Sequence, residues 1–406
     1  MVRMSDILKR ARERKEREQR EKEKRSSLEP GQPETASSLP PSSPLPQSPE
    51  QKIPPAPQPA EPEEVKTPAG EEPGPVEKKK EQKEEKTKTS EVRISPLIIK
   101  RPRLLSDEEA EKVYDQALFL MQEMLRKNID YKSIDVKRIA AQVEKIVDQL
   151  NLGNEELLKL VFIKDFRNEN YLSYHSINVC IWSIEVGMGL AYDKTRLVEL
   201  GICALLHDMG MPEYLDLANQ PRKLTVEEYN EIKNHPVKGS EILEKIKNLE
   251  KIALYVAHQE HERVDGSGYP QGLKEESITE YAKIIGLVDT YEAMTHPRSY
   301  RDGFLPLETM QKILAKKDTF GYRLMKVLIE KVGIFPVGSY VELSTKEIAQ
   351  VIKLNHTASL RPVVKIIYEA DSQAPKETRI VDLTASSTVY IKKGLRKSEL
   401  GTLRAV

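Results

Sequence analysis

The sequence predicts a mainly α-helical protein with a small β module near its C-terminus and a disordered N-terminal tail. Three observations lead to this fold class. Residues 1–92 contain no Phe, Tyr or Trp but hold 15 of the 26 prolines. From about Ser106 to residue 333, apolar side chains recur every three or four positions, which is the spacing of an amphipathic helix. After Pro336, five short runs rich in β-branched residues are separated by polar turns.

Charge balance and cysteine content exclude several classes of protein. The chain has 406 residues with 64 basic and 64 acidic side chains, so its formal net charge is zero. Proteins that bind long nucleic acids usually carry a basic excess, and we expect no such partner. Two cysteines cannot form a disulfide scaffold. Because no uncharged apolar run approaches ~18 residues and the N-terminus lacks the apolar stretch of a secretory signal, we expect a cytoplasmic protein without a membrane span.

The same patterns divide the chain into four predicted segments. Residues 1–95 form a charged, proline-rich tail with too few apolar side chains to fold. Residues 104–165 form an N-terminal helical segment, and residues 166–335 form a larger helical domain. Residues 336–396 form the small barrel-like β module. The alternating charges near the N-terminus predict an exposed segment, and a docking helix for a partner is a second interpretation.

The helices and strands follow from local patterns taken in chain order. Ser106 and Glu109 fit a capping box that starts the first helix, and Thr225 and Glu228 fit a second one. Apolar stripes then predict further helices over about 134–150, 154–162, 174–186, 195–207, 226–246, 249–262, 279–295 and 307–333. The predicted strands are Tyr340–Ser344, Ala349–Leu354, Val363–Tyr368, Ile380–Leu383 and Thr388–Ile391.

Histidines and isolated carboxylates recur at positions that are hard to explain as core. Histidines occur on four successive predicted helices between residues 175 and 261, and helices in a bundle can each direct one side chain into a shared cavity. His207 and Asp208 end the apolar run LGICALL, and Asp289 follows AKIIGLV. An unpaired buried carboxylate is costly unless a cation binds it. Mixed imidazole and carboxylate ligands suit Mn, Fe or Zn.

Four segments together resemble the HD-GYP domain, a branch of the HD phosphohydrolases. They are LLHDMGMPE, NHPVKGSEIL, HERVDGSGYPQGL and GLVDTYEAMTHPRSYR, and they stand in the family's order and spacing from about Asn170 to Phe335. A lone His-Asp pair would be weak evidence, but its combination with DGSGYP and the downstream D-x-x-x-A-M-T-x-x-R-x-Y-R is specific. The segment FPVGSYVELSTKEIAQVIKLN also resembles the small β extension that is often fused to this domain.

The resemblance implies an HD-type helical bundle over residues 166–335 that hydrolyses cyclic di-GMP to pGpG, GMP or both. Two divalent metals, commonly Fe or Mn, would supply an activated hydroxide. His207 and Asp208 would be the catalytic pair. The implied metal ligands are His175, His207, Asp208, His235, Glu260, His261 and Asp289. The implied substrate-binding residues are Asp265, Gly268, Tyr269, Pro270, Arg298 and Arg301.

The sequence departs from the family pattern at several positions. Met211 stands where many members have a Lys after the HDxG motif, and Glu260 replaces the first His of the family's HHE. Tyr171 stands where members with three metals have a Glu, so we expect two metals. These departures keep two alternatives open. One is a catalytically weak or inactive HD-GYP receptor or scaffold that binds a cyclic dinucleotide or a signalling partner, and the other is a phosphodiesterase for another cyclic dinucleotide such as a cyclic GMP–AMP. A protein partner at the GYP loop and a homodimer are further expectations.

The remaining histidines and the cysteines have mainly structural interpretations. We expect His258 to be a surface residue, and a substitute metal ligand is the alternative. We expect His296 to lie in a loop near the arginines, with a substrate contact as the alternative, and His356 to be exposed. Cys180 and Cys203 lie on apolar helices and are expected in the core, together with Trp182.

Overall fold

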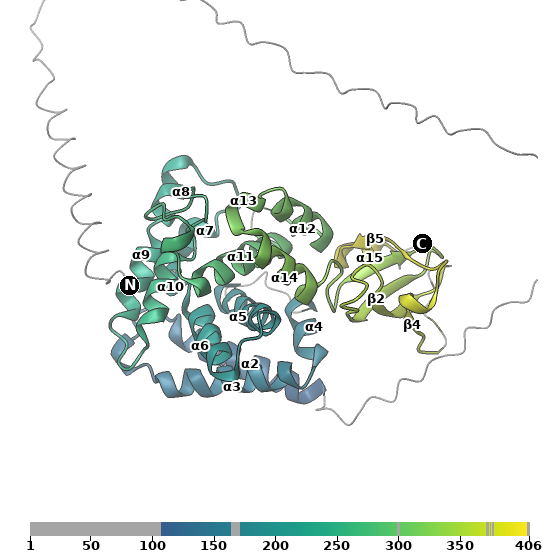
Figure 1. Cartoon of the computed structure of the whole chain (residues 1–406), viewed down its shortest axis with the longest axis horizontal. Coiled ribbons are helices and arrows are strands. Elements are labelled where there is room, and N and C mark those ends of the chain that lie inside the picture. The colour runs from purple at the N-terminus through teal and green to yellow at the C-terminus, as the bar shows by residue number, and fades with distance from the viewer. Residues whose placement is uncertain are drawn as a thin grey trace, which may run out of the picture. The chain divides into compact units, whose positions relative to one another are not determined.

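The computed structural model describes residues 107–163, 171–298, 301–370, 373, 375 and 377–403. These residues form a helical bundle followed by a small antiparallel sheet (Figure 1), which confirms the predicted fold class. The predictions for the tail at 1–95 and for the Ser106 cap lie outside the described residues. None of the described helices is both long and apolar enough to cross a membrane.

The first helices of the bundle agree with the predicted stripes. The N-terminal segment forms α2 (Asp107–Met124), α3 (Val136–Asn151) and α4 (Glu155–Ile163), and the next two helices are α5 (Tyr171–Gly189) and α6 (Lys194–Leu206). Most of α5 is buried, Trp182 and Cys180 included, and α5 contacts α2, α3, α4, α6, α11 and α14. A helix that is apolar on all sides is expected at the centre of a bundle, and α5 occupies that position.

Two of the long predicted helices are interrupted. The stretch 226–246 forms α8 (Val226–Ile232) and α9 (His235–Leu243), with Pro236 in the first turn of α9. The stretch 307–333 forms α12 (Pro306–Leu314), α13 (Lys317–Phe320) and α14 (Tyr322–Val332), and Gly321 at φ +79° separates the last two. Proline favours a helix start, and Gly321 adopts a conformation that ends one.

The other helices lie near their predicted positions. They are α7 (Leu215–Ala218), preceded by a 3₁₀ turn at Met211–Tyr214, then α10 (Lys251–Gln259) and α11 (Glu280–Thr295). The predicted capping box at α8 is present: the Thr225 hydroxyl accepts from the Glu228 amide, and the Glu228 carboxylate accepts from the Thr225 amide. This cap fixes the helix that precedes His235.

The C-terminal module contains five strands in one antiparallel sheet of order β4-β3-β2-β1-β5. The strands are β1 (Tyr340–Leu343), β2 (Ile348–Lys353), β3 (Val363–Tyr368), β4 (Ile380–Asp382) and β5 (Ile391–Leu395), and the short helix α15 (Lys397–Leu403) follows them. The last strand was predicted at Thr388–Ile391, whereas β5 begins at Ile391. Val341, Val351 and Val364 belong to a hydrophobic cluster separate from that of the bundle.

One close backbone approach positions two of the predicted site segments. Gly210, two residues after Asp208, packs against the first turns of α9. A Cβ atom on Gly210 would lie 2.1 Å from the carbonyl oxygen of His235 and 2.6 Å from the amide nitrogen of Gly239. Only a residue without a side chain allows this contact, so Gly210 sets the distance between the His207–Asp208 pair and His235.

We predict that Gly210→Ala destabilises the bundle by about 1–3 kcal/mol, because the backbone of α9 must move to admit the methyl group. Gly394→Ala is the matched control, since its Cβ would meet only Leu305 at 3.7 Å. Denaturant unfolding of both variants tests the prediction. Equal stability of the two variants would refute the close approach.

Candidate metal centre

The seven predicted metal ligands lie together inside the helical bundle. His175 comes from α5, and His207 and Asp208 from the end of α6. His235 begins α9, Glu260 and His261 follow the last turn of α10, and Asp289 lies on α11. Six of the seven are buried and His261 is partly buried. The fold therefore gathers the complete predicted set, although their role as ligands stays a prediction.

Hydrogen bonds to the Nδ1 atoms orient three of the imidazoles. The Nδ1 of His207 lies 2.7 Å from the carbonyl oxygen of Ala204, and that of His235 lies 2.7 Å from the carbonyl oxygen of Ile232. The Nδ1 of His175 lies 2.5 Å from a carboxylate oxygen of Glu292. Because a carbonyl or carboxylate oxygen accepts the Nδ1 proton, Nε2 is the atom of each ring that is available to bind a metal. These Nε2 atoms face the cluster.

The ligand atoms form overlapping groups of the size that a metal ion requires. His175, His207 and Asp289 offer atoms that lie within 4.8 Å of one another, and so do His235, Glu260 and His261. These two groups share no residue. A third group, His207, Asp208 and Glu260, overlaps both. The residues of these groups are therefore candidate ligands for a divalent metal.

Several atoms in the cluster have no hydrogen-bond partner within the described part of the chain. They are His207 Nε2 and both carboxylate oxygens of Glu260, all buried. The Nε2 atoms of His235 and His261 lie only 3.0 Å apart, and both rings have depressed pKa values. Buried polar atoms in native proteins are normally paired. Divalent cations would satisfy all of these atoms together, so the residues present fit a metal site.

The protonation preferences of the metal-free cluster show its electrostatic imbalance. Burial, with Asp208 and Asp289 nearby, raises the pKa of Glu260 well above its usual range. Burial and the neighbouring His235 lower the pKa of His261. Burial opposes the charged form of His175 too, but Glu292 and Asp289 outweigh it and raise the pKa of that imidazole. The crowding of carboxylates and imidazoles in this buried cluster therefore shifts the pKa values of both kinds of group.

A cavity of about 730 Å³ opens onto the cluster. Its lining includes His175, Asp208, His235, His261 and Asp289 from the ligand set. Tyr171, Met211, Asn219, Tyr269, Arg298 and Arg301 also line it. A ligand in this cavity would meet arginine and tyrosine side chains as well as the predicted metal ligands.

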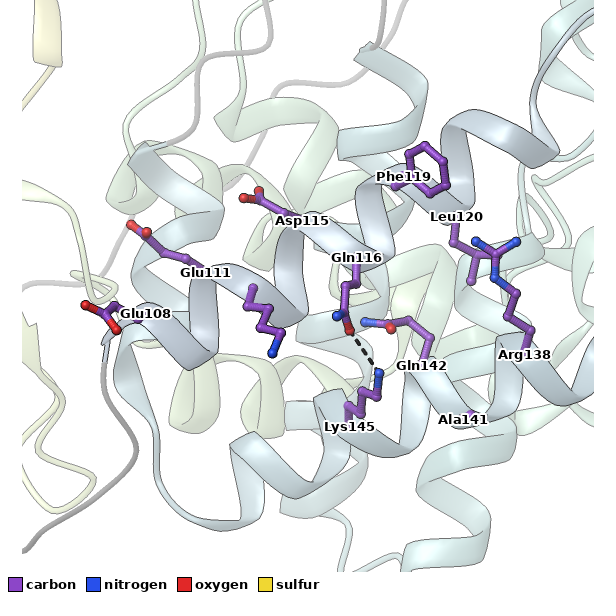
Figure 2. A pocket seen from close by; sticks show the side chains of 11 residues that line it. Glu108, Glu111, Asp115, Gln116, Phe119, Leu120, Arg138, Ala141, Gln142 and Lys145 are labelled. Carbon is purple, nitrogen blue, oxygen red and sulfur yellow. Dashed lines mark hydrogen bonds between the residues drawn. The ribbon is translucent and has the colours of Figure 1, made fainter.

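A second cavity, of about 770 Å³, lies between α2 and α3 (Figure 2). Charged side chains such as Glu111, Asp115 and Arg138 surround it, and Lys145 donates to Gln116 across it. It contains none of the predicted site residues, so the cluster cavity is the candidate site.

The two predicted phosphate-binding arginines differ in their surroundings. Arg298 lies with its guanidinium carbon 4.0 Å from the ring centroid of Tyr171. Arg301 donates to the carbonyl oxygens of Ala293 and Met294 at the end of α11. Arg301 thus stabilises a helix C-terminus, and Arg298 is the better candidate for contacting a phosphate.

The GYP loop contributes one side chain to the cavity. The Tyr269 ring stacks on His261 with centroids 4.7 Å apart. Gly268 approaches the backbone of Arg263 so closely that a Cβ would lie 2.4 Å from its amide nitrogen. Pro270 follows a cis peptide bond. Asp265 is exposed, accepts from Ser267 and does not line the cavity, so it shapes the turn.

One histidine differs from its predicted environment. His258 is buried rather than exposed, because α10 turns it toward α9, where its Nδ1 lies 3.3 Å from the Ser240 hydroxyl. His296 lies in the bend that follows α11, two residues before Arg298, as predicted, and it is buried, with its Nε2 3.0 Å from the carbonyl oxygen of Val161. His356 is exposed and Cys203 is buried, as predicted.

The sequence reasoning missed Glu292 and Asn178, which are buried directly behind His175. Glu292 lies three residues after Asp289, and Asn178 lies three residues after His175. Residues three apart share a helix face. A polar residue at that spacing from a predicted ligand could therefore have been identified from the sequence.

Comparison with known proteins assigns two segments of the chain to known domain families. Residues 166–323 match the HD domain family, and residues 340–403 match the KOW domain associated with HD domain. A cyclic di-GMP phosphodiesterase of Pseudomonas aeruginosa is 30% identical over 253 residues, which cover 62% of this chain and 61% of that protein. One from Borreliella burgdorferi is 27% identical over 252 residues, 60% of this chain and 66% of that protein. A 3′3′-cGAMP-specific phosphodiesterase of Vibrio cholerae is 30% identical over 145 residues, 35% of this chain and 27% of that protein.

Residues 166–323 of the helical bundle thus belong to the HD domain family. Their His-Asp pair, their GYP loop and these relatives support its HD-GYP branch. The matches span less than two thirds of the length of the first two relatives.

We predict that Mn²⁺ raises the melting temperature of the wild type and does so much less for Glu260→Gln. A bound ligand at 100 times its Kd adds about 2.7 kcal/mol of stability, and the uncharged amide is a weaker ligand. Without metal the variant should be at least as stable as the wild type, because an unpaired buried carboxylate has been removed.

Glu199→Gln is the control for this comparison, since Glu199 accepts a hydrogen bond from Tyr281 and does not line the cavity. An equal Mn²⁺ response in wild type and Glu260→Gln would show that Glu260 is not a ligand.

Proposed function

We propose that this protein is a metal-dependent phosphodiesterase that hydrolyses cyclic di-GMP to pGpG, GMP or both. The proposal includes two ions, iron or manganese, and a cytoplasmic location. The observation that carries it is the set of buried imidazoles and carboxylates, with unpaired atoms, at the floor of a cavity lined by Arg298. The curated names of the relatives supply the substrate class.

Each group of residues has a distinct role in this proposal. The seven ligands would hold two divalent ions, which lower the pKa of a water molecule and neutralise phosphoryl oxygens when bound. The carbonyl oxygens of Ala204 and Ile232 keep the protons of His207 and His235 on Nδ1. Asp208 would be a ligand beside both groups, since its carboxylate oxygens lie 3.5 Å from Nε2 of His175 and 3.4 Å from Nε2 of His235.

Arg298 and two tyrosines would bind and orient the substrate. The guanidinium of Arg298 can donate two parallel hydrogen bonds to a phosphate, and its contact with Tyr171 holds its plane. The Tyr269 ring offers an aromatic surface beside His261 on which a base can stack. Glu262 fixes this loop by accepting from the amides of Gln271 and Leu273. Met211 lines the cavity without a charge, so the arginine carries more of the phosphate binding.

A different cyclic dinucleotide is the second candidate substrate. It is favoured by the similarity to a relative named as 3′3′-cGAMP-specific. The inactive receptor, a protein partner at the GYP loop and a homodimer stay predictions from the sequence.

We predict that wild-type protein, purified anaerobically with Fe²⁺ or Mn²⁺, converts cyclic di-GMP to pGpG or GMP and that Asp208→Ala does not. Product chromatography, with 3′3′-cGAMP assayed in parallel, checks this. Turnover of 3′3′-cGAMP alone would reassign the substrate. Binding of cyclic di-GMP by metal-loaded protein without any product would favour the receptor.

We predict that Arg298→Ala raises KM by about 10–100-fold, because hydrogen bonds to charged groups are worth about 1.5–3 kcal/mol and about 1.4 kcal/mol is tenfold in affinity. Arg138→Ala is the control. Arg138 pairs with Glu123 and lines the other cavity, between α2 and α3, rather than the cavity of the candidate site. An unchanged KM in Arg298→Ala would remove this arginine from the substrate site.

A further inference from the structure

A chain of buried hydrogen bonds extends from His175 away from the cavity. The Nδ1 of His175 lies 2.5 Å from Oε2 of Glu292, on α11. The other carboxylate oxygen, Oε1, accepts from the side-chain amide of Asn178 at 3.0 Å. Glu292 is 1% exposed and Asn178 is fully buried. The carboxylate that orients His175 is therefore itself held in place by a second side chain.

The chain continues into the N-terminal helical segment. The hydroxyl of Tyr114, on α2, donates to Oδ1 of Asn178 at 2.9 Å, and Tyr114 is fully buried. Residues 166–323 match the HD domain, so α2 lies outside the matched region. Tyr114, on a helix outside the segment that matches the HD domain, is thus linked by hydrogen bonds to the predicted metal ligand His175. Asn178 and Glu292 form the links between them.

Glu292 also lies close to the predicted phosphate-binding arginine, Arg298, and to His296. Its Oε2 lies 3.9 Å from Nη2 of Arg298, and its Oε1 lies 3.1 Å from Nδ1 of His296. One carboxylate therefore touches the predicted ligand His175 and the predicted phosphate-binding arginine. A change in its position would be felt by both groups.

Packing alone does not explain why Tyr114, Asn178 and Glu292 are polar residues. A carboxylate and an amide buried among helices are costly unless each polar atom is paired. Leu or Phe would fill the same space without that cost. The pairing instead fixes one orientation of the His175 ring, because a carboxylate bonded to Nδ1 directs Nε2 toward Asp289, 3.1 Å away.

We propose that Tyr114, Asn178 and Glu292 are positioning residues for His175 and that α2 thereby sets the affinity of the metal centre. The proposal rests on the metal binding included in the proposed function. It assigns to the N-terminal helical segment a part in the site in addition to its part in the core.

The test measures metal binding rather than hydrolysis. Full-length wild type, Glu292→Gln and Tyr114→Phe are titrated with Mn²⁺, and the visible absorption spectrum of each Co²⁺-loaded protein is recorded. Glu292→Gln should weaken Mn²⁺ binding by about 10–100-fold, the usual effect of removing such a partner. Tyr114→Phe should weaken it several-fold, and both should change the Co²⁺ spectrum.

Tyr281→Phe is the matched control. It removes the hydroxyl of another buried tyrosine, which donates to the carboxylate of Glu199 and does not line the cavity. It should lower the melting temperature about as much as Tyr114→Phe while leaving metal affinity and the Co²⁺ spectrum unchanged. A general loss of stability would affect the two tyrosine variants alike.

A double variant tests the order of the chain. If Tyr114 acts through Glu292, adding Tyr114→Phe to Glu292→Gln should weaken Mn²⁺ binding no further. The proposal is overturned if Glu292→Gln binds Mn²⁺ like wild type, if the two tyrosine variants have equal metal affinity, or if wild type binds no metal. Wild type that binds metal without hydrolysing any cyclic dinucleotide would refute only the proposed function.

Discussion

The structure depends on the burial of like-charged carboxylates in the middle of a helical bundle. Asp208, Glu260 and Asp289 converge within one cluster, and their ion-pair partners within 4 Å, among the described residues, are histidines. Carboxylates in a low dielectric repel one another and lose their hydration. Cations would remove this penalty, whereas protonation would remove the ligands. If these residues bind metal as proposed, the stability of the fold depends on the occupancy of the site.

Helix ends deliver most of the ligands to this cluster. His207 and Glu260 are the C-caps of α6 and α10, and His235 is the first residue of α9. Side chains at helix ends can point into a shared space while the helix bodies pack around it. The direct contact of Gly210 with α9 then fixes the separation between two of these ends. The geometry of the site is thus a consequence of backbone packing as much as of the ligands.

The site is also supported by residues that touch no substrate. Glu292 orients His175 and lies beside Arg298, and Tyr114 reaches the same carboxylate through Asn178. Glu262 holds the GYP loop through two backbone amides. Because a buried, fully paired polar network resists rearrangement, these supports give the cavity a single shape. They also extend the functional unit beyond the residues that match the HD domain.

Local pattern in the sequence was sufficient for the fold class, the Thr225 cap and the five strands in outline, because residue chemistry and helical spacing are properties of the chain itself. The set of candidate ligands came from the resemblance of four segments to the HD-GYP family. The same spacing predicted single helices over 226–246 and 307–333, where the structure has α8 and α9, and α12, α13 and α14. A continuing apolar stripe does not reveal a short break such as those at Pro236 and Gly321.

Only the tertiary structure decided which helix faces meet. It buried His258, assigned Arg301 to a helix end and placed Asp265 outside the cavity. It also brought Tyr114 next to Asn178, 64 positions away in the chain. Periodicity predicts that a face is buried but does not identify its partner, because the partner is chosen by packing between segments far apart in sequence.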